Sequence, residues 1–433
     1  MKFTCYTLGC KVNQYETQAM EQLLTALGHT LCPEGADCDA VIVNTCTVTA
    51  VADRKNRTLI RRLRREHPQA VLGVCGCYAQ LNAEDIAALG VDVVSGSAGR
   101  EEFLQRLLQR VERRGEGTEI QVDEALHRRS FEVLPAGGLA ARTRAMLKVQ
   151  DGCNNFCTYC IIPYARGRVR SLPLENAVAE ARKLAAEGYR EIVVNGIEIS
   201  SWGWEWHDGS CLRQLLAALC AAVPSVRIRL GSLEPRTIDE EFCKTLSGFE
   251  NLCPQFHLSL QSGSDSVLRR MHRKYDSARY LQSVELLHRY FPGCAVTTDL
   301  IVGFPGETEA EFEASLALIR RCALSKVHIF PYSRREGTPA AKMPDQVPKA
   351  VKEARASRAA AVAAELEDAF HTSLIGTEQP VLFEQPENGF YAGHAPNYAK
   401  VYTAPGELHN AVRRVRITEL CRDGVFGVLT DTP

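Results

Sequence analysis

The chain has 433 residues and a nearly balanced charge, with 51 Lys and Arg against 52 Asp and Glu, so it is long enough for two or three domains and any nucleic-acid surface must be local. It has no apolar run of about 18 residues that could span a membrane, and its start, MKFTCYTLGCKVNQYE, lacks the apolar core and cleavage site of a secretory signal, so we expect a cytoplasmic protein. The 17 cysteines, an odd number in a long chain without that signal, argue against a disulfide framework and for metal-binding or catalytic thiols.

The first unit, residues 1–115, alternates short apolar runs with helical patterns. This alternation predicts a doubly wound, parallel α/β domain. The expected strands cover 2–8, 40–46, 70–75 and 91–96, and the expected helices cover 14–28, 49–66 and 100–114.

Three cysteines of this unit, Cys10, Cys46 and Cys77, each fall just past a predicted strand. The carboxyl ends of parallel strands face one crevice, so the three thiols are expected to converge there. The residues alone leave two interpretations open: a three-thiolate iron–sulfur site, or three unrelated loop cysteines that serve packing. Cys5 and Cys75 lie inside strands and are predicted to belong to the core.

Residues 116–143 lose the alternation and are predicted to be a linker. A second alternating series then fills residues 144–371, with helical segments such as 173–188 and a long Ala-rich helix over 346–371. It predicts a partial (β/α)6 barrel, a class that works at the carboxyl ends of its strands. The expected barrel strands cover 145–150, 191–196, 226–232, 256–262, 296–303 and 326–333.

Directly after the first barrel strand stand Cys153, Cys157 and Cys160, spaced C-x3-C-x2-C. Three thiolates hold three irons of a [4Fe–4S] cluster and leave the fourth iron open. An open iron can chelate S-adenosylmethionine (SAM), and one electron from the cluster then yields a 5′-deoxyadenosyl radical. The alternative is a three-cysteine zinc site with a distant fourth ligand, but no His or Cys follows at zinc-finger spacing.

Polar and flexible residues near the other strand ends are candidate cofactor contacts. Tyr159, between the last two cysteines, is expected to pack near the adenine of the cofactor, and GFPGET would let the backbone approach it at Gly303. The polar candidates are Asn195, Glu198, Ser232, Glu234, Ser259, Gln261 and Asp299.

The tail, residues 372–433, changes to short strands with Gly and Pro turns, which predicts a small all-β, OB-like barrel. Aromatic and basic residues occur together in it, as suits base stacking and phosphate contact, although strand residues of a core look similar. They are Phe390, Tyr391, Tyr398, Lys400, Tyr402, Arg413, Arg414 and Arg416. The basic helix over 54–66 is a second candidate RNA surface.

Several motifs together resemble the methylthiotransferase family of radical-SAM enzymes across essentially the whole chain. They are GCKVNQYET, VNTCTVT, GCYAQ, QDGCNNFCTYCIIPYARG, RLGSLEP, HLSLQSGSD, LIVGFPGET and FPYSRREGTP. Within that family, GCKVNQYE and FPYSRREGTP favour the tRNA branch that converts N6-threonylcarbamoyladenosine to its 2-methylthio form.

The resemblance implies two [4Fe–4S] clusters, and all six cysteines are then metal ligands and catalytic residues. Cys153, Cys157 and Cys160 would bind the SAM-cleaving cluster, whereas Cys10, Cys46 and Cys77 would bind an auxiliary cluster that handles sulfur. One SAM would supply the methyl group and a second the radical that activates C2 of the adenine. Implied partners are the tRNA anticodon loop, held by a TRAM domain in the tail, an electron donor such as flavodoxin or ferredoxin, and a sulfur donor.

One position departs from the family pattern: Glu198 stands where a His is expected, which puts its role in doubt. The alternatives within the family act on N6-isopentenyladenosine in tRNA or on a ribosomal-protein aspartate. A cobalamin-binding radical enzyme would need an Asp-x-His-x-x-Gly loop, which the sequence lacks. A non-catalytic RNA-binding iron–sulfur sensor would not cleave SAM.

Overall fold

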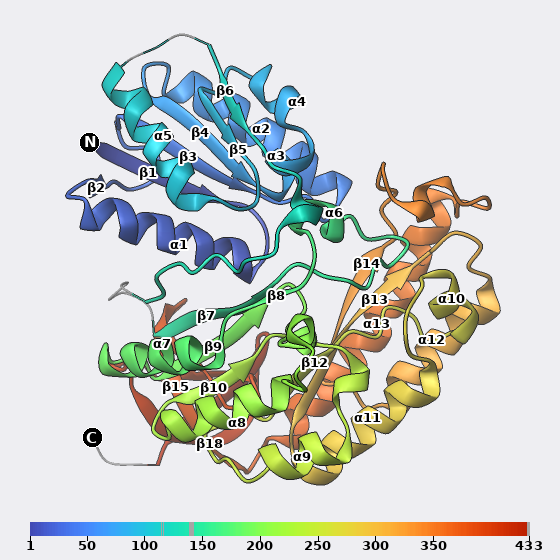
Figure 1. Ribbon diagram of the computed structural model, residues 1–433. Coiled ribbons are helices and arrows are strands. Elements are labelled where there is room, and N and C mark those ends of the chain that lie inside the picture. Colours follow the sequence, from blue (N-terminus) through green and yellow to red (C-terminus); the bar gives the residue numbers. More distant parts are fainter. Residues whose placement is uncertain (114, 116, 138–142, 431–433) are drawn as a thin grey trace.

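Three β-structures follow one another along the chain, each built around a core of its own (Figure 1). The computed structural model describes residues 1–113, 115, 117–137 and 143–430. Among these residues, no helix is both long enough and apolar enough to cross a lipid bilayer. The predicted fold class is confirmed: an α/β domain, a partial β/α barrel and a closed all-β barrel.

The N-terminal sheet is parallel, with strand order β2-β1-β3-β4-β5-β6. Helices α1 and α5 cover one face, where Met20 and Phe103 pack, and α2, α3 and α4 cover the other, where Ile60 and Tyr78 pack. The strands are β1 (Lys2–Thr7), β2 (Thr30–Leu31), β3 (Ala40–Thr45), β4 (Val71–Gly76), β5 (Val93–Ser95) and β6 (Glu119–Gln121). The helices are α1 (Lys11–Ala26), α2 (Ala50–Glu66), α3 (Cys77–Leu81), α4 (Ala83–Ala87) and α5 (Arg100–Arg113).

The sheet extends into the segment 116–143, since β6 pairs with β5 in parallel. Residue 116 and residues 138–142 of that segment lie outside the described residues. The remainder carries a short 3-10 helix, Ala125–His127, and then crosses to the barrel.

The second β-structure is an open, curved sheet. The predicted strand 226–232 is two strands: β10 pairs with β9, β11 pairs with β12, and Gly231 lies between them. The strand order is therefore β8-β7-β9-β10 followed by β11-β12-β13-β14, and every pair except β7–β8 is parallel. The strands are β7 (Arg144–Asp151), β8 (Arg170–Ser171), β9 (Glu191–Gly196), β10 (Arg227–Leu230), β11 (Ser232–Leu233), β12 (Gln255–Leu258), β13 (Ala295–Val302) and β14 (Lys326–Pro331).

Helices cover the outer face of this curved sheet and share one continuous apolar core with it (Figure 1). Side-chain caps mark where several helices begin, since Asp239, Asp276 and Thr308 each accept a backbone hydrogen bond at a helix N-terminus. The helices are α6 (Ile162–Arg166), α7 (Leu174–Ala186), α8 (Leu212–Ala222), α9 (Glu240–Leu246), α10 (Asp265–Arg270), α11 (Ser277–Tyr290), α12 (Glu309–Arg321) and α13 (Lys349–Ser373).

The tail closes into a barrel with strand order β15-β16-β17-β19-β18. Its strands are β15 (Glu378–Glu387), β16 (Phe390–His394), β17 (Lys400–Thr403), β18 (Val412–Cys421) and β19 (Gly424–Leu429); residues 431–433 lie outside the described residues. Tyr391 and Tyr402, two candidates for base stacking in the sequence analysis, are buried in this barrel and are not accessible to RNA bases. Strand cores alternate in this way whether or not the surface binds RNA.

Candidate functional site

The loop that carries Cys153, Cys157 and Cys160 is fixed by backbone hydrogen bonds at the end of β7. The Cys153 amide donates to the carbonyl of Gly167 at 3.0 Å, and the Thr158 amide donates to the carbonyl of Met271 at 3.1 Å. Gly152, just before the loop, has φ +73°, and a Cβ there would collide with the backbone carbonyl of Arg168. The local sequence therefore holds the three thiols close together.

The thiols of this first triad interact electrostatically with one another, and an arginine supports them. Arg273 donates to Cys157 Sγ at 3.1 Å and also lies 3.8 Å from the Glu234 carboxylate. Burial raises the pKa of Cys160 to about 12. A buried thiol of this kind becomes a ligand when a cation displaces its proton, and an adjacent arginine favours the thiolate.

Two carboxylates lie beside this triad. Glu198 interacts with Cys153, and burial followed by the charge of Glu234 raises the pKa of Glu198 to about 7. Glu198 also accepts a hydrogen bond from the Ser200 amide at 3.1 Å. The residue that departs from the family pattern thus lies at the candidate site, next to a proposed cluster ligand.

The thiols of the second triad, Cys10, Cys46 and Cys77, also converge and interact electrostatically with one another. Cys10 is the N-cap of α1, Cys46 follows β3 directly and Cys77 opens α3 after β4. The order in which strands are added to the sheet reverses at β1. The chain goes from β1 to β2 on one side of β1 and then to β3 on the other side. Such a switch point is where open α/β sheets bind ligands.

Two glycines with positive φ make this convergence possible. A Cβ on Gly9 (φ +119°) would lie 2.7 Å from Cys46 Cβ, and one on Gly76 (φ +104°) would lie 2.5 Å from the Thr45 carbonyl oxygen. Neither position accommodates a side chain, so glycine is required at both for the loops to approach one another.

Arg166 connects the two triads. It closes α6, six residues after Cys160, and its Nε donates to Cys77 Sγ at 3.0 Å. The rest of its guanidinium donates to Asn13 Oδ1 at 2.9 Å and to Glu16 of α1. Arg166 is fully buried, so a residue of the curved sheet's own unit completes the surroundings of a thiol on the N-terminal sheet.

The interface between the N-terminal sheet and the curved sheet, where Arg166 lies, contains an excess of buried positive charge. Glu16 pairs with Arg100 at 2.9 Å and with Lys148 at 3.0 Å, besides Arg166, and Lys148 also pairs with Asp151 at 2.7 Å. These cations hold the pKa of Glu16 well below its usual range, against the effect of burial. A buried cationic excess beside three thiols suits a ligand set that becomes anionic when it binds a cluster.

Over the residues that the structure places, no three or more Cys, His, Asp or Glu side chains form a site for one metal ion. The ligands of a [4Fe–4S] cluster lie further apart than those of a single ion, because each thiolate binds a different iron. The donor set of each triad, three thiols with one arginine donating to a sulfur, fits such a cluster in chemical type.

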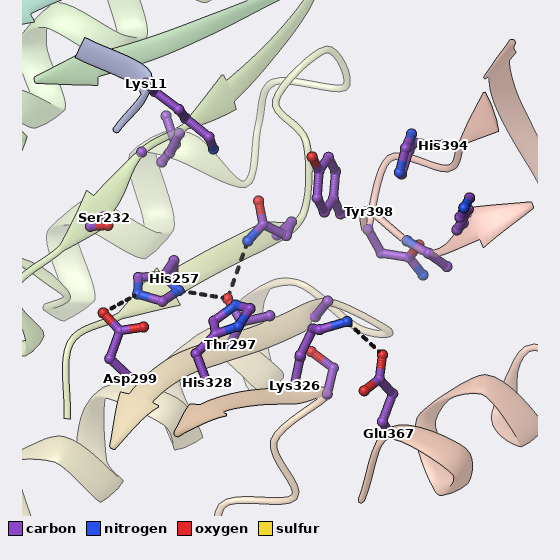
Figure 2. Close-up of a pocket in the computed structure, with 18 of the residues that line it drawn as sticks. Lys11, Ser232, His257, Thr297, Asp299, Lys326, His328, Glu367, His394 and Tyr398 are labelled. Carbon is purple, nitrogen blue, oxygen red and sulfur yellow. Dashed lines mark hydrogen bonds and ion pairs between the residues drawn. The ribbon is translucent and has the colours of Figure 1, made fainter. Parts of the chain in front are cut away.

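A cavity of about 580 Å³ inside the curved sheet reaches from Cys10 of the second triad to the C-terminal barrel (Figure 2). Its lining is polar: His257 lies between Thr297 at 3.0 Å and Asp299 at 3.4 Å, and Lys326 pairs with Glu367 at 2.8 Å. Cys10 lines the same cavity. One residue of the second triad therefore borders the space inside the curved sheet.

The predicted cofactor contacts divide into those that line this cavity and those that do not. Asn195, Ser232 and Asp299 line it, and the buried amide of Asn195 has no hydrogen-bond partner in the described chain. The others do not line it: Tyr159, Glu198, Glu234, Ser259, Gln261 and Gly303. Of these, Tyr159 and Glu198 interact electrostatically with thiols of the first triad. An unpartnered buried amide carries a cost that a polar ligand would remove.

Two of these predicted contacts have specific surroundings. Tyr159 packs on an apolar cluster that includes Phe304 and Met271. The Gly303 amide donates to Glu307 at 2.6 Å, and Lys352 fills the space where a Gly303 side chain would lie.

Sequence reasoning missed Glu16, Arg166 and Arg273. Glu16 lies within GCKVNQYET and Arg166 within IIPYARG, two motifs in which the cysteines are the visible signal. Their partners are far away along the chain, as Arg166 and Glu16 are separated by 150 positions. The sequence did offer one signal for Glu16. Asn13 and Glu16 follow Cys10 at three and six positions, and residues three apart are neighbours on the surface of a helix.

Comparison with protein families gives two matches. The sequence model of the Radical SAM superfamily matches residues 147–319, and the model described as Uncharacterized protein family UPF0004 matches residues 2–96. The first match covers the curved sheet from β7 to α12, and the second covers the N-terminal sheet as far as β5.

Curated relatives resemble nearly the whole chain. Over 406 residues it is 41% identical to the threonylcarbamoyladenosine tRNA methylthiotransferase MtaB of Bacillus subtilis, which covers 92% of this chain and 89% of that protein. It is 36% identical over 430 residues to the MtaB protein of Thermotoga maritima, covering 98% and 96%. The tRNA-2-methylthio-N(6)-dimethylallyladenosine synthase of Maricaulis maris is 35% identical over 445 residues, covering 98% and 96%.

Solved structures share the fold at low identity. The radical S-adenosylmethionine methyltransferase TsrM of Kitasatospora setae, with cobalamin and a [4Fe-4S] cluster bound, superimposes with a TM-score of 0.57 at 17% identity over 78% of this chain and 76% of that one. The cobalamin-dependent S-adenosylmethionine radical enzyme OxsB gives a TM-score of 0.55 at 12% identity, covering 78% and 54%. Both are α/β folds with which this chain shares its arrangement of elements.

Proposed function

Because the chain belongs to the methylthiotransferase family of radical-SAM enzymes, in its MtaB branch, we propose that it attaches a methylthio group to C2 of N6-threonylcarbamoyladenosine next to the anticodon of tRNA. The observation that carries this proposal is the 41% identity, over 92% of the chain, to a relative named for that activity. The polar cavity beside Cys10 supports it, since a polar N6 substituent suits such a lining better than an apolar isopentenyl group.

As a radical-SAM enzyme the protein uses SAM and an iron–sulfur cluster, and we propose that it holds two [4Fe–4S] clusters and consumes two SAM. Cys153, Cys157 and Cys160 would hold one, and Cys10, Cys46 and Cys77 the other. When bound, the first supplies the electron that cleaves SAM and the second carries the sulfur. An adenine C2–H is not usefully acidic, so acid–base residues alone would not remove it.

The chain's own residues prepare and enclose this chemistry. Arg273 and Arg166 each donate a hydrogen bond to one sulfur of a triad, which favours the thiolate form. Asn195, Ser232 and Asp299 face the cavity and are the proposed SAM or substrate contacts, with the other strand-end residues proposed for the cofactor near the first triad. The C-terminal barrel covers part of the cavity and so limits the access of water to it.

We propose that tRNA contacts the exposed basic side of α2. Arg54, Lys55, Arg61 and Arg65 are all exposed there, and α2 begins four residues after Cys46. Basic side chains that face solvent in a row are suited to phosphates. We also propose that the enzyme works on its tRNA substrate in the cytoplasm, where an electron donor such as flavodoxin or ferredoxin and a sulfur donor would serve it.

The test is a reconstituted reaction on anticodon stem-loops that differ only in the target nucleoside. The anaerobically reconstituted protein receives SAM, a reductant and a stem-loop with either N6-threonylcarbamoyladenosine or N6-isopentenyladenosine, and mass spectrometry identifies the nucleosides. We expect the 2-methylthio product from the first stem-loop. Product from the isopentenyl stem-loop alone would refute the proposed substrate, and the absence of methylthio product from both stem-loops would refute the tRNA assignment.

A further inference from the structure

Lys11 lies on the wall of the cavity, and no carboxylate of the described residues forms an ion pair with its ammonium group. It follows Cys10 at the start of α1, and its ammonium points into the cavity (Figure 2). Among the described residues, its Nζ makes no ion pair or hydrogen bond. The other two lysines on this wall are paired: Lys326 with Glu367 at 2.8 Å, and Lys400 with Glu387 at 2.9 Å.

The surroundings of Lys11 leave its charge uncompensated. Burial lowers the pKa of Lys11, and its electrostatic neighbours are Tyr398, Arg144, Arg229 and Glu191. Glu191 is already bound by Arg229, with distances of 2.6 and 3.0 Å, and Arg144 pairs with Glu384 at 2.9 Å. Each arginine is thus matched by one carboxylate, so these neighbours offer no further carboxylate to Lys11. A charge of this kind inside a cavity attracts an anionic group.

An independent observation points to a polar ligand in the same cavity. The Asn195 side chain is 2% exposed and lines the cavity, and both its amide nitrogen and its amide oxygen lack a partner in the part of the chain that the structure describes. A buried amide with neither bond satisfied is costly. A ligand that offers both a donor and an acceptor would satisfy it, as a carbamoyl group does.

We infer that Lys11 binds the carboxylate of the threonylcarbamoyl group on the target adenine and selects for that group. The inference rests on the proposed function. C2 and C6 of adenine flank N1, and N6 is attached to C6, so a substituent on N6 lies on the same edge of the base as the carbon that receives sulfur. Lys11 is the chain neighbour of Cys10, a proposed ligand of the site that handles sulfur, so the carboxylate and C2 reach the same end of the cavity together.

The same contact discriminates against an isopentenyl group. An apolar chain beside Lys11 would remove water from the ammonium without offering a partner, which costs binding free energy. A site built for a charged group rejects an analogue without it more strongly than an apolar pocket rejects an added polar group. Lys11 therefore acts on specificity as well as on affinity.

The experiment compares two anticodon stem-loops: one with N6-threonylcarbamoyladenosine, and one in which the threonine carboxylate is a neutral carboxamide. Dissociation constants are measured by fluorescence anisotropy with the reconstituted holoenzyme. We expect the wild type to bind the carboxylate form about tenfold or more tightly than the carboxamide. Lys11→Gln should remove this preference and leave the affinity for the carboxamide unchanged, whereas Lys11→Arg should keep most of it.

Iron content and the visible absorption spectrum show that each variant retains its clusters, which matters because Lys11 adjoins Cys10. Lys326→Gln is the matched control, since it removes a cavity lysine that Glu367 already pairs, and it should keep the wild-type preference. Equal loss in both variants would show a general effect of cavity charge and overturn the assignment to Lys11. A full preference in Lys11→Gln would overturn it as well.

The outcomes separate this inference from the proposed function. A wild type that methylthiolates N6-threonylcarbamoyladenosine but binds both stem-loops equally would overturn the role of Lys11 and leave the function standing. A wild type that modifies only N6-isopentenyladenosine would overturn both.

Discussion

Gly76 shows how one residue fixes the place of a candidate ligand. Its φ of +104° and ψ of −168° lie in a region that essentially only glycine adopts, and it joins β4 directly to Cys77 at the start of α3. The turn leaves no room for a side chain beside Thr45. The thiol of Cys77 therefore comes to lie at the sheet edge next to Cys46.

Gly76→Ala is expected to lower the free energy of unfolding by about 3 kcal/mol, because strain and collision add. Gly28→Ala is the control: φ there is +83° but nothing lies within 4 Å of the added Cβ, so we expect a loss of about 1 kcal/mol. Urea unfolding of the cluster-free proteins measures both. Equal losses in the two variants would show that crowding at Gly76 is unimportant.

Glu16 is the carboxylate on which the buried cations of the interface depend. Its side chain is fully buried and pairs with Arg100, Lys148 and Arg166. Removing one partner of a buried ion pair leaves the others uncompensated, which is more harmful than the loss of a surface pair. Glu16 of α1 therefore links the N-terminal unit to the curved sheet through its ion pairs with Lys148 and Arg166.

Glu16→Gln is expected to lower the free energy of unfolding at pH 7 by about 3 kcal/mol. The folded-state pKa of Glu16 lies below its ordinary 4.5, so the unfolded chain takes up this proton first as the pH falls. The stabilisation is thus complete above about pH 5 and declines below it. The variant should lose less stability than the wild type between pH 5 and pH 3, as urea unfolding across that range would show.

The exposed Glu250→Gln is the matched control and should change stability by less than about 0.5 kcal/mol. A wild-type pH dependence that Glu16→Gln reproduces in full would mean that other carboxylates carry it.

At the residue scale, strand-end placement alone predicted where the six cysteines lie relative to the strands. The residues that surround them could not be predicted, because a sequence gives no information on which distant charge a buried side chain meets. In the sequence Arg166 is an ordinary basic residue at the end of a short helix, and only the fold brings Cys77 and Glu16 to it.

At the scale of elements, the two triads are built in different ways. One triad lies on a single loop after β7, whereas the other draws one cysteine from the end of each of three strands. Helix α6 joins the two, because it begins shortly after the first loop and ends at Arg166 beside Cys77. The two triads are thus distinct groups of thiols that α6 connects.

This separation predicts that each triad can be removed without the other. The wild type should hold roughly eight irons after anaerobic reconstitution. Replacing Cys153, Cys157 and Cys160 by Ala should remove about half and abolish SAM cleavage. Replacing Cys10, Cys46 and Cys77 should also remove about half, but 5′-deoxyadenosine should still form while sulfur insertion stops.

Iron analysis and chromatography of SAM products measure these outcomes. Full iron in the first variant would contradict its ligand assignment, and undiminished methylthio product from the second would contradict an auxiliary site. Mutation of the buried Cys220, which lies in the core of the curved sheet, serves as the cysteine control and should leave the iron content unchanged.

Long elements were predictable and short ones were not. The barrel strands and the helix α13 carry enough residues for their pattern to be visible. The strands β2, β8 and β11 span two residues each, too few to show alternation, and the split at Gly231 depends on which neighbour each half pairs with. The strand β6, which lies within the predicted linker 116–143, was missed for the same reason, because it spans only three residues.

At the scale of the whole molecule, the tail is part of the cavity as well as a separate barrel. Arg227 donates to the Pro380 carbonyl at 2.6 Å and Arg229 to the Pro396 carbonyl at 2.9 Å, while Tyr398 stacks on His394 at 4.6 Å and lines the cavity. Deleting the tail would open the cavity. RNA binding is therefore better tested by changing surface charges than by truncation.

Replacing Arg54, Lys55, Arg61 and Arg65 of α2 by Gln should weaken tRNA binding and make its salt dependence shallower, by roughly 0.7–0.9 in slope for each phosphate that is no longer neutralised. The control variant replaces four exposed arginines elsewhere on the surface: Arg182, Arg190, Arg269 and Arg289. Anisotropy at several salt concentrations measures the slope. An equal change in both variants would show that only net charge matters and that α2 is no specific RNA surface.

The most direct test of the proposed activity is mass spectrometry of tRNA nucleosides from a strain in which this gene is deleted. We predict that 2-methylthio-N6-threonylcarbamoyladenosine disappears while its unmethylthiolated precursor accumulates, and that the wild-type gene, but not the Cys10, Cys46 and Cys77 triple variant, restores the product. Unchanged levels of that nucleoside in the deletion strain, with loss of the isopentenyl counterpart instead, would contradict the proposed activity.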